Sequence, residues 1–428
     1  MRIGGRLQAA IEVLEAIEQH HKPVANALKD WGSSHRFAGS GDRGAIGNIV
    51  YDALRMKLSH GYMMGDDSPR AIAFAVLLRQ WGMTIDDLKN QLDGDKFAPE
   101  FLSDAQMSQF QNANLTQADE HVQGDIPQWL MDDFKRAFGD DWLIEAQALT
   151  QRPSLDLRVN TLRSTREKVL NSLSKTNAVA GDLLADSVRI TADNGPGRLP
   201  NVAADIPFAK GWFEIQDEGS QLAAALTDGQ KGEQVLDYCA GGGGKSLALS
   251  AAMDNSGQIH TYDNDRRRMA PMIERLRRAG TRNVQLIEDD EALAQLLDNC
   301  DKVLVDAPCS GTGTWRRRPD TKWRLSEKSL ATRLNQQKEV INKASQYVRP
   351  GGELTYVTCS VLPQENDAIV SKFLDENSNF EAIDLSQKWV ELTGRDDVPR
   401  SHTGIGILCS PHRTGTDGFF VAKLNRVA

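Results

Sequence analysis

The sequence predicts an α/β protein with a doubly wound parallel sheet, preceded by a small β-α-β module and an all-helical N-terminal domain. From about residue 212, short apolar segments typical of buried strands alternate with helical sequence. Residues 1–120 instead repeat apolar residues every three or four positions, which indicates helices. Residues 154–192 show a strand pattern, a helix pattern and a second strand pattern. We therefore expect domains at 1–120, 125–205 and 206–428.

The first domain is expected to consist of amphipathic helices separated by Gly and Asp-Asp breaks. After it, residues 104–124 are polar and have the composition of a linker. A new helix is expected to open near Pro127, and Ser164 is a suitable N-cap for the helix of the module. The chain contains no run of about 18 apolar residues, and its first residues are amphipathic. We expect no membrane span and a cytoplasmic location.

Charge and cysteine content narrow the possible functions. The formal net charge is −9, which taken alone argues against nucleic-acid binding. Arginine nevertheless clusters at 266–278 and at 315–324, and the second run, WRRRPDTKWR, interleaves tryptophan with arginine. Such a run offers stacking surfaces and phosphate contacts, although solvated helix faces and buried tryptophans are the alternative interpretation.

The five cysteines contain no Cys-x-x-Cys pair, so neither a disulfide framework nor a metal site is expected.

The densest glycine cluster, DYCAGGGGKS at 237–246, joins a short apolar strand to a helix. A P-loop requires glycine where Cys239 stands, and the dinucleotide fingerprint requires glycine where Ser246 stands. The loop therefore favours close backbone approach to a ligand other than a triphosphate. Asp263 follows the next strand and can accept both hydroxyls of a ribose, although capping the following helix is an equally simple role.

Two cysteines follow apolar strands that are expected to end at the same edge of the sheet. DKVLVDAPCSGTG places Asp306 and Cys309 directly after one strand, and ELTYVTCS places Cys359 after another. Because the carboxyl ends of such strands converge on one cleft, these three side chains are expected to meet there. A cysteine at a strand end is often only a small buried side chain. We assign that structural role to Cys300 and Cys409.

These segments carry a resemblance to a known family. DAPCSGTG and TCS, together with DYCAGGGGKS, resemble motifs of the NOL/NOP/Sun family of RNA 5-methylcytosine methyltransferases, in its bacterial RsmB-like branch. QDEGSQ, GTWRRRPDTKW, GTDGFFVAKL, IPQW and LRVNTLRST resemble further segments of the family, and DRGAIGNIVYDALR is similar to a NusB-type RNA-binding domain. The family loop usually reads Cys-Ala-Ala-Pro-Gly-Gly-Lys, whereas this chain has Gly241 and Gly242 in place of the second Ala and the Pro.

The resemblance implies a Rossmann-like class I methyltransferase domain that binds S-adenosylmethionine in its glycine loop. The loop residues concerned are Cys239, Ala240, Gly241, Gly242, Gly243, Gly244 and Lys245. Asp263 would bind the ribose, and Asp290 would lie near the adenine, with Asp289 as a rival. Asp306 would lie beside the methionine end of the cofactor.

The resemblance also assigns the chemistry. Cys359 would be the nucleophile that adds to carbon 6 of cytosine, and Cys309 would assist release of the methylated product. Covalent addition activates carbon 5, which is otherwise a poor nucleophile. Asp306 could give a proton or a hydrogen bond to ring nitrogen 3, either as a partly protonated acid or through a shared proton. Lys245 or Arg317 could stabilise the thiolate.

The expected substrate is RNA, with ribosomal RNA favoured over transfer RNA by the NusB-type likeness. Arg316, Arg317 and Lys322 are the expected RNA contacts, and Trp315 and Trp323 are candidate stacking partners. We expect a monomer that uses no metal. A non-catalytic RNA-binding assembly factor and a dinucleotide oxidoreductase remain as alternatives, and the sequence does not identify the target nucleotide.

Overall fold

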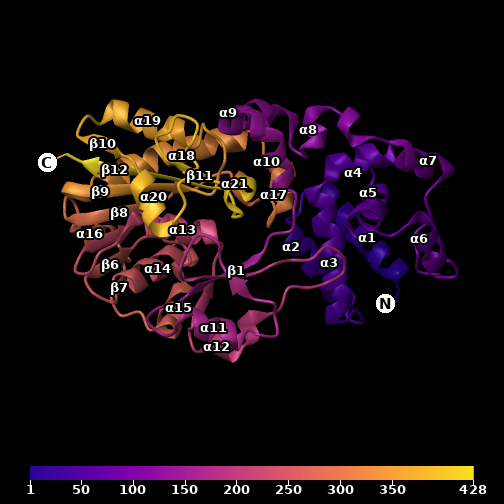
Figure 1. Ribbon diagram of the computed structural model, residues 1–428, viewed down its shortest axis with the longest axis horizontal. Coiled ribbons are helices and arrows are strands. Elements are labelled where there is room, and N and C mark those ends of the chain that lie inside the picture. The colour runs from indigo at the N-terminus through magenta and orange to yellow at the C-terminus, as the bar shows by residue number, and fades with distance from the viewer. Residues whose placement is uncertain (428) are drawn as a thin grey trace.

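The computed structural model describes residues 1–427 as two lobes, with the N-terminus at one end of the molecule and the C-terminus at the other (Figure 1). Residues 1–123 form the helical lobe. Its helices are α1 (Ile3–His20), α2 (Val24–Ser34), α3 (Ser40–Arg55), α4 (Lys57–Met64), α5 (Pro69–Ala75), α6 (Ile85–Leu92), α7 (Asp104–Asn112) and α8 (Glu120–Gln123). Their apolar sides enclose one core that includes Leu7, Ile49 and Phe74. No helix within residues 1–427 combines the length and the apolar character that crossing a bilayer requires.

The expected linker at 104–124 is instead mostly helical. Ser103 and Gln106 form a capping box at the start of α7, which explains why this polar segment starts a helix. Gln106 Nε2 also donates a hydrogen bond to Asp66 Oδ2 at 2.7 Å. The segment therefore packs on the helical lobe, and its polar composition reflects an exposed outer face.

A four-stranded antiparallel sheet forms the module between the lobes. Its order is β2-β3-β1-β4, with β1 (Leu155–Val159), β2 (Val179–Ala180), β3 (Ser187–Ile190) and β4 (Phe213–Ile215). Helices α11 (Arg166–Ser172) and α12 (Ile206–Ala209) accompany it. Only β1, α11 and β3 were expected. The sheet also extends past the expected boundary at residue 205, because β4 pairs with β1.

The larger sheet has eight strands, in the order β10-β12-β9-β8-β5-β6-β7, with β11 beside β12. The strands are β5 (Gln234–Asp237), β6 (Gln258–Thr261), β7 (Val284–Leu286), β8 (Cys300–Asp306), β9 (Val348–Thr358), β10 (Phe380–Ile383), β11 (Ile407–Cys409) and β12 (Phe419–Arg426). Strands β7, β6, β5, β8 and β9 pair in parallel, whereas β12 pairs antiparallel with β9, β10 and β11. The strand order reverses between β5 and β8, which is where ligands bind in doubly wound folds.

Helices cover both faces of this sheet, as expected for a doubly wound fold (Figure 1). They are α13 (Glu218–Thr227), α14 (Gly244–Ala252), α15 (Met272–Ala279), α16 (Asp290–Ala294), α17 (Pro319–Arg324), α18 (Glu327–Ser345), α19 (Asp367–Glu376), α20 (Ser386–Thr393) and α21 (Pro411–Thr414). Two helices from before the module, α9 (Met131–Phe138) and α10 (Trp142–Ala148), join the core on one face. There Phe134 stacks on Trp315 with ring centroids 5.8 Å apart.

Candidate active site

The glycine loop runs from the end of β5 to the start of α14 at the point where the strand order reverses. Gly241 and Gly243 adopt left-handed backbone, with φ of 49° and 76°. A Cβ on Gly243 would come within 2.7 Å of the Met272 side chain, so this position requires glycine. Ala240 N donates to Tyr262 O at 3.0 Å, which anchors the loop to the chain after β6. The loop is thus a fixed bare stretch of backbone.

A cavity of about 270 Å³ opens against this loop. Its lining includes six of the seven expected loop residues, Cys239, Ala240, Gly241, Gly242, Gly244 and Lys245, together with Asp306. Gly243 forms the turn behind the lining. Gly242, one of the two glycines that replace the family's Ala and Pro, is held by Arg275, which also lines the cavity and whose Nη1 donates to Gly242 O at 2.5 Å.

Asp263 lies beside the cavity and is buried. Its Oδ2 accepts a hydrogen bond from Gly241 N at 3.0 Å, and it pairs with Arg268 Nη1 at 3.0 Å. Arg268 also lines the cavity, so its side chain lies between Asp263 and the solvent-filled space. Asp263 therefore shapes the loop in addition to any contact it makes with a ligand.

Asp289 and Asp290, the two candidates for a contact with the adenine, have different surroundings in the structure. Asp289 caps α16, because its Oδ1 accepts a hydrogen bond from Ala292 N at 2.7 Å. Asp290 is exposed as the first residue of α16. Burial, followed by the nearby Asp290, raises the pKa of Tyr262, which places Asp290 near the end of β6. Of the two, Asp290 is the one whose carboxylate is free of a helix-capping bond.

Asp237, the last residue of β5, is a buried carboxyl at the wall of the cavity. Its Oδ2 accepts a hydrogen bond from Ser246 Oγ at 2.6 Å, whereas its Oδ1 has no partner within residues 1–427. Burial, with a contribution from Asp306, raises the pKa of Asp237 to about 7. Asp237 can therefore change its charge near neutral pH, a property that its position in the sequence did not reveal.

The two cysteines at the ends of β8 and β9 meet, as the sequence predicted. Cys309 Sγ and Cys359 Sγ are 3.3 Å apart. The hydrogen bond with Cys359, then burial and the negative charges of Cys359 and Glu365, raise the pKa of Cys309 well above its usual range. Cys309 is therefore a thiol at neutral pH and can donate a hydrogen bond to the sulfur of Cys359.

A buried carboxylate that sequence reasoning missed holds the Cys309 loop in place. Glu365 accepts hydrogen bonds from Ser310 N at 2.7 Å, from Ser310 Oγ and from Gln337 Nε2 at 3.0 Å. The segment VLPQENDAIV offered a signal, since acidic residues interrupt an otherwise apolar stretch directly after Cys359. An ionisable residue in such a setting is typical of a polar network beneath a site.

Lys245 and Asp306 form an ion pair between the cavity and the thiols. Lys245 Nζ lies 2.6 Å from Asp306 Oδ2. Burial lowers the pKa of Lys245, but Asp306, Asp237 and Cys359 outweigh burial and raise it. Lys245 therefore remains an ammonium and is a nearby cation that can stabilise a thiolate at Cys359. The pair therefore places an N–H donor, the Lys245 ammonium, directly beside Asp306.

Most of the run WRRRPDTKWR is buried, although Arg318 and Arg324 are exposed, and this burial corrects most of the expected RNA contacts. Trp315 is fully buried, and Trp323 Nε1 donates to Leu54 O at 2.7 Å inside the helical lobe. Lys322 is 1% exposed and donates to Arg55 O at 2.9 Å and to Asp125 O at 2.7 Å. Trp315 therefore cannot stack on a substrate base, Trp323 is half-buried against the helical lobe, and the Lys322 ammonium cannot reach a phosphate.

The two arginines of this run are bound within the protein. Arg316 is buried and pairs with Asp417 and Asp217. Arg317 also pairs with both carboxylates, at 2.8 Å from Asp217 Oδ2, and donates to Ser154 O at 3.0 Å. Its side chain is 30% exposed, so only an edge of the guanidinium remains accessible. Arg316 therefore cannot contact an RNA phosphate. The guanidinium of Arg317 is already paired with Asp217 and Asp417 inside the protein.

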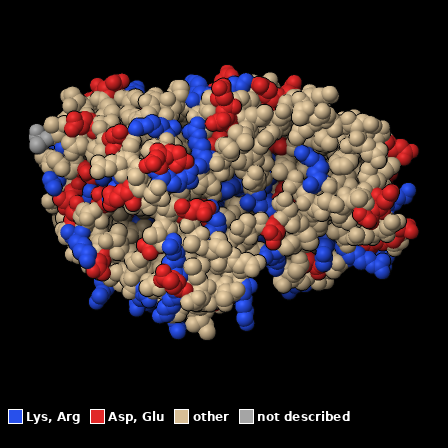
Figure 2. All heavy atoms as spheres, viewed as in Figure 1, with Lys and Arg blue, Asp and Glu red and all other residues tan. Residues whose placement is uncertain are grey.

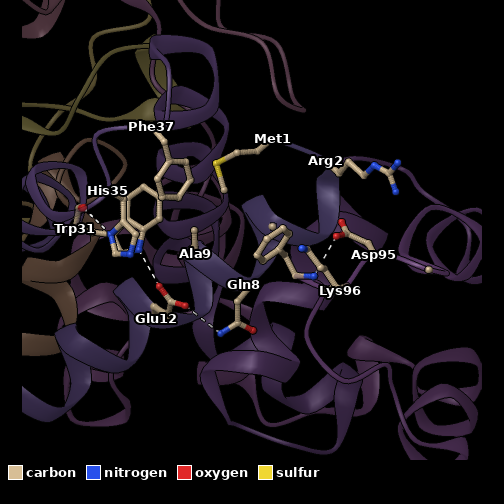
Figure 3. A pocket seen from close by; sticks show the side chains of 14 residues that line it. Met1, Arg2, Gln8, Ala9, Glu12, Trp31, His35, Phe37, Asp95 and Lys96 are labelled. Carbon is tan, nitrogen blue, oxygen red and sulfur yellow. Dashed lines mark hydrogen bonds between the residues drawn. The ribbon is translucent and has the colours of Figure 1, made fainter.

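The largest cavity described, about 1010 Å³, lies in the helical lobe and is lined by residues of α1, the end of α2 and the segment 94–98 (Figure 3). Figure 3 shows Trp31 and His35 stacked at its wall, with Phe37 above them. Trp31 Nε1 donates to Glu12 Oε2 at 2.9 Å, and Gln8 Nε2 donates to Glu12 Oε1 at 3.2 Å. These polar groups already bind one another, and none of the residues expected to bind the cofactor or to carry the reaction lines this cavity. Within residues 1–427, no three His, Cys, Asp or Glu side chains gather as a metal site.

Two family models match this chain. Residues 224–425 match the 16S rRNA methyltransferase RsmB/F, and residues 126–194 match the ferredoxin-like domain of RsmF/B-like methyltransferases. The probable ribosomal RNA small subunit methyltransferase B of Synechocystis sp. is 32% identical over 70% of this chain and 67% of its own length. Ribosomal RNA small subunit methyltransferase B of Pectobacterium atrosepticum is 33% identical over 70% of this chain and 66% of its own length. The match thus spans about two thirds of these relatives.

Solved structures share the fold. PH0851 superimposes with a TM-score of 0.74 at 24% identity over 100% of both chains. NSun6 from Pyrococcus horikoshii, solved with the S-adenosylmethionine analogue SFG, has a TM-score of 0.61 at 21% identity over 71% of this chain and 98% of its own. The doubly wound sheet, the antiparallel module and the sequence matches agree, and the chain belongs to the RsmB/F family of ribosomal RNA methyltransferases.

Proposed function

We propose that this protein transfers a methyl group from S-adenosylmethionine to carbon 5 of a cytosine in ribosomal RNA, through a covalent bond between Cys359 and the base. The observation that carries the proposal is the 3.3 Å separation of the Cys309 and Cys359 sulfurs beside the Lys245–Asp306 ion pair. Family membership and the names of the relatives support ribosomal RNA as the substrate. A ribosomal RNA substrate is consistent with action in the cytoplasm.

The residues of the cavity fit S-adenosylmethionine. Gly241, Gly242 and Gly244 line the cavity without side chains, and the unpartnered Oδ1 of Asp237 gives its wall an anionic group that suits a positively charged ligand. Asp263 is suited to ribose hydroxyls once Arg268 moves aside. Asp290 is suited to an adenine edge. When bound, S-adenosylmethionine supplies the electrophilic methyl group that carbon 5 attacks.

The thiols have separate roles in this proposal. The Cys359 thiolate adds to carbon 6, forming a carbon–sulfur bond and moving the electrons of the 5,6 double bond towards carbon 5 and the ring nitrogen. The Asp306–Lys245 pair supplies a hydrogen bond or a proton to nitrogen 3 as negative charge develops there. Lys245 also stabilises the thiolate before addition.

Release of the product depends on Cys309. Its pKa is raised first by the hydrogen bond with Cys359, then by burial and by the charge of Cys359. Two of these causes disappear once the Cys359 sulfur is bonded to carbon. Cys309 can then lose its own proton to water and accept the proton on carbon 5. The electron pair of that carbon–hydrogen bond re-forms the 5,6 double bond, the carbon–sulfur bond breaks, and Cys359 leaves as a thiolate.

The direct test is transfer of tritium from labelled S-adenosylmethionine to a small-subunit ribosomal RNA transcript, followed by digestion and nucleoside analysis. We expect the label in 5-methylcytidine. Label in another nucleoside, or no transfer to any ribosomal RNA or ribosomal particle despite cofactor binding, would contradict the proposal. Residues 1–120 would serve as an accessory RNA-binding domain in this scheme.

A further inference from the structure

A basic crevice separates the helical lobe from the module. It has a volume of about 450 Å³, within the range of ligand sites. One wall is the C-terminal half of α3, and the other is formed by the loop that follows β3 at 191–200 and the turn at 175–177. Asn48 Nδ2 joins the two walls by donating to Gly195 O at 3.1 Å and to Gly197 O at 2.7 Å. The crevice is thus a defined space shared by two parts of the chain.

The floor of the crevice holds two arginines, the buried Arg55 and the half-buried Arg152, around one carboxylate. Arg55 Nη1 lies 2.7 Å from Asp52 Oδ1, and Arg152 pairs with the same side chain and donates to Asp193 O at 2.8 Å. A single carboxylate cannot neutralise two guanidinium groups, so the floor keeps a net positive charge. Arg55 Nε also donates to Arg316 O at 2.7 Å, which connects the floor to the segment that follows Cys309.

The rim adds two exposed cations, Lys175 and Arg198. Within residues 1–427 neither forms an ion pair, unlike the arginines at 316 and 317. The side chains of Lys175, Arg198, Arg55 and Arg152 face two carboxylates, those of Asp52 and Asp193, so the crevice is cationic in a chain whose formal net charge is −9. Figure 2 shows Lys and Arg side chains where the helical lobe meets the rest of the molecule.

We propose that this crevice binds the sugar–phosphate backbone of a single-stranded RNA segment flanking the target cytosine. Unpaired cations on the rim of a groove attract a polyanion and raise its local concentration there. The half-buried ring of Tyr51, which has the guanidinium of Arg55 5.6 Å from its centroid, offers a surface for a base. The proposal rests on the proposed function for the identity of the polyanion.

The test compares the double variant K175A/R198A with K328A/R333A, which removes one exposed lysine and one exposed arginine from α18. Fluorescence anisotropy with a short end-labelled single-stranded RNA would be measured over a series of salt concentrations. We expect K175A/R198A to bind roughly tenfold more weakly, and the slope of log affinity against log salt to fall by about 1.4, the value for two lost contacts to a single strand. The control variant should match the wild type in both quantities.

Cofactor calorimetry on both variants shows whether the fold is intact. Unchanged RNA affinity and unchanged salt slope in K175A/R198A would overturn the crevice proposal, even if the enzyme methylates ribosomal RNA. Equal displacement of the RNA by an acidic polypeptide of the same charge would also overturn it. If K175A/R198A loses RNA affinity while the wild type methylates no RNA, the crevice stands and the proposed function fails.

Discussion

Cys309 and Cys359 lie with their sulfurs 3.3 Å apart, although 50 residues separate them in the chain. Each follows a strand of the parallel part of the sheet, and β8 and β9 are neighbours. The contact raises the pKa of Cys309 and leaves Cys359 beside the Lys245 ammonium. The surroundings therefore suit the Cys359 sulfur to nucleophilic attack and the Cys309 sulfur to later proton transfer.

Replacing Cys359 by alanine should reduce methyl transfer roughly a thousandfold or more, since the substitution removes the nucleophile. Cofactor affinity should stay within about twofold, because Cys359 does not line the glycine-loop cavity. Tritium transfer and calorimetry measure the two quantities. Cys409→Ala, which removes a buried thiol at the end of β11, is the matched control and should remain active. Normal activity in Cys359→Ala would eliminate the covalent mechanism.

Replacing Lys245 by methionine keeps an unbranched side chain of nearly the same length and removes its charge. We expect iodoacetamide to alkylate Cys359 about tenfold more slowly near neutral pH, because the thiolate loses its neighbouring cation. Mass spectrometry of the peptide that contains Cys359, without cofactor present, gives the rate. An unchanged alkylation rate would show that Lys245 does not stabilise the thiolate.

The affinity for S-adenosylmethionine should rise between about pH 6 and pH 8, because the pKa of Asp237 is about 7. A positive ligand favours ionised Asp237, so binding releases a proton and becomes tighter as pH increases through that pKa. Calorimetry in buffers of different ionisation enthalpy measures the proton release. Asp237→Asn should remove this dependence, and the neutral product S-adenosylhomocysteine should show less of it. The same pH dependence in Asp237→Asn would contradict this role.

Replacing Lys322 by alanine should lower the free energy of unfolding by about 2–6 kcal/mol, the range for leaving two buried acceptors unsatisfied. The change removes the donor to two backbone carbonyls, Arg55 O and Asp125 O, and a positive charge near the buried Asp125 carboxylate. Chemical denaturation measures the loss. The salt slope of RNA binding, measured at a temperature where the variant is folded, should not change. If the variant has wild-type stability but a lower slope of log RNA affinity against log salt, Lys322 contacts RNA and this prediction is wrong.

The parts of the site that follow parallel strands could be predicted from sequence. Apolar strands ending in Asp237, Asp306 and Cys359 are local patterns, and their convergence follows from the topology of the sheet. The left-handed glycines were foreseeable for the same reason, since a bare strand-to-helix turn needs them.

Features that depend on distant partners could not be predicted. The run around Lys322 has the composition of an RNA surface, but Leu54, Arg55 and Asp125, which are remote in sequence, enclose its side chains. Strand β4 has only three residues and finds its partner β1 more than fifty residues earlier, so no local period indicates it. Tertiary contacts decide both cases.

The most direct test of the account uses Cys309→Ala with ribosomal RNA and S-adenosylmethionine. Without Cys309 the proton on carbon 5 has no acceptor, so the methylated base should stay bonded to Cys359 as a protein–RNA adduct that survives denaturing electrophoresis. The adduct should be absent in the double variant Cys309→Ala/Cys359→Ala and in Cys359→Ala alone. Efficient turnover by Cys309→Ala with no adduct, or an adduct that persists without Cys359, would contradict the assignment of the two thiols.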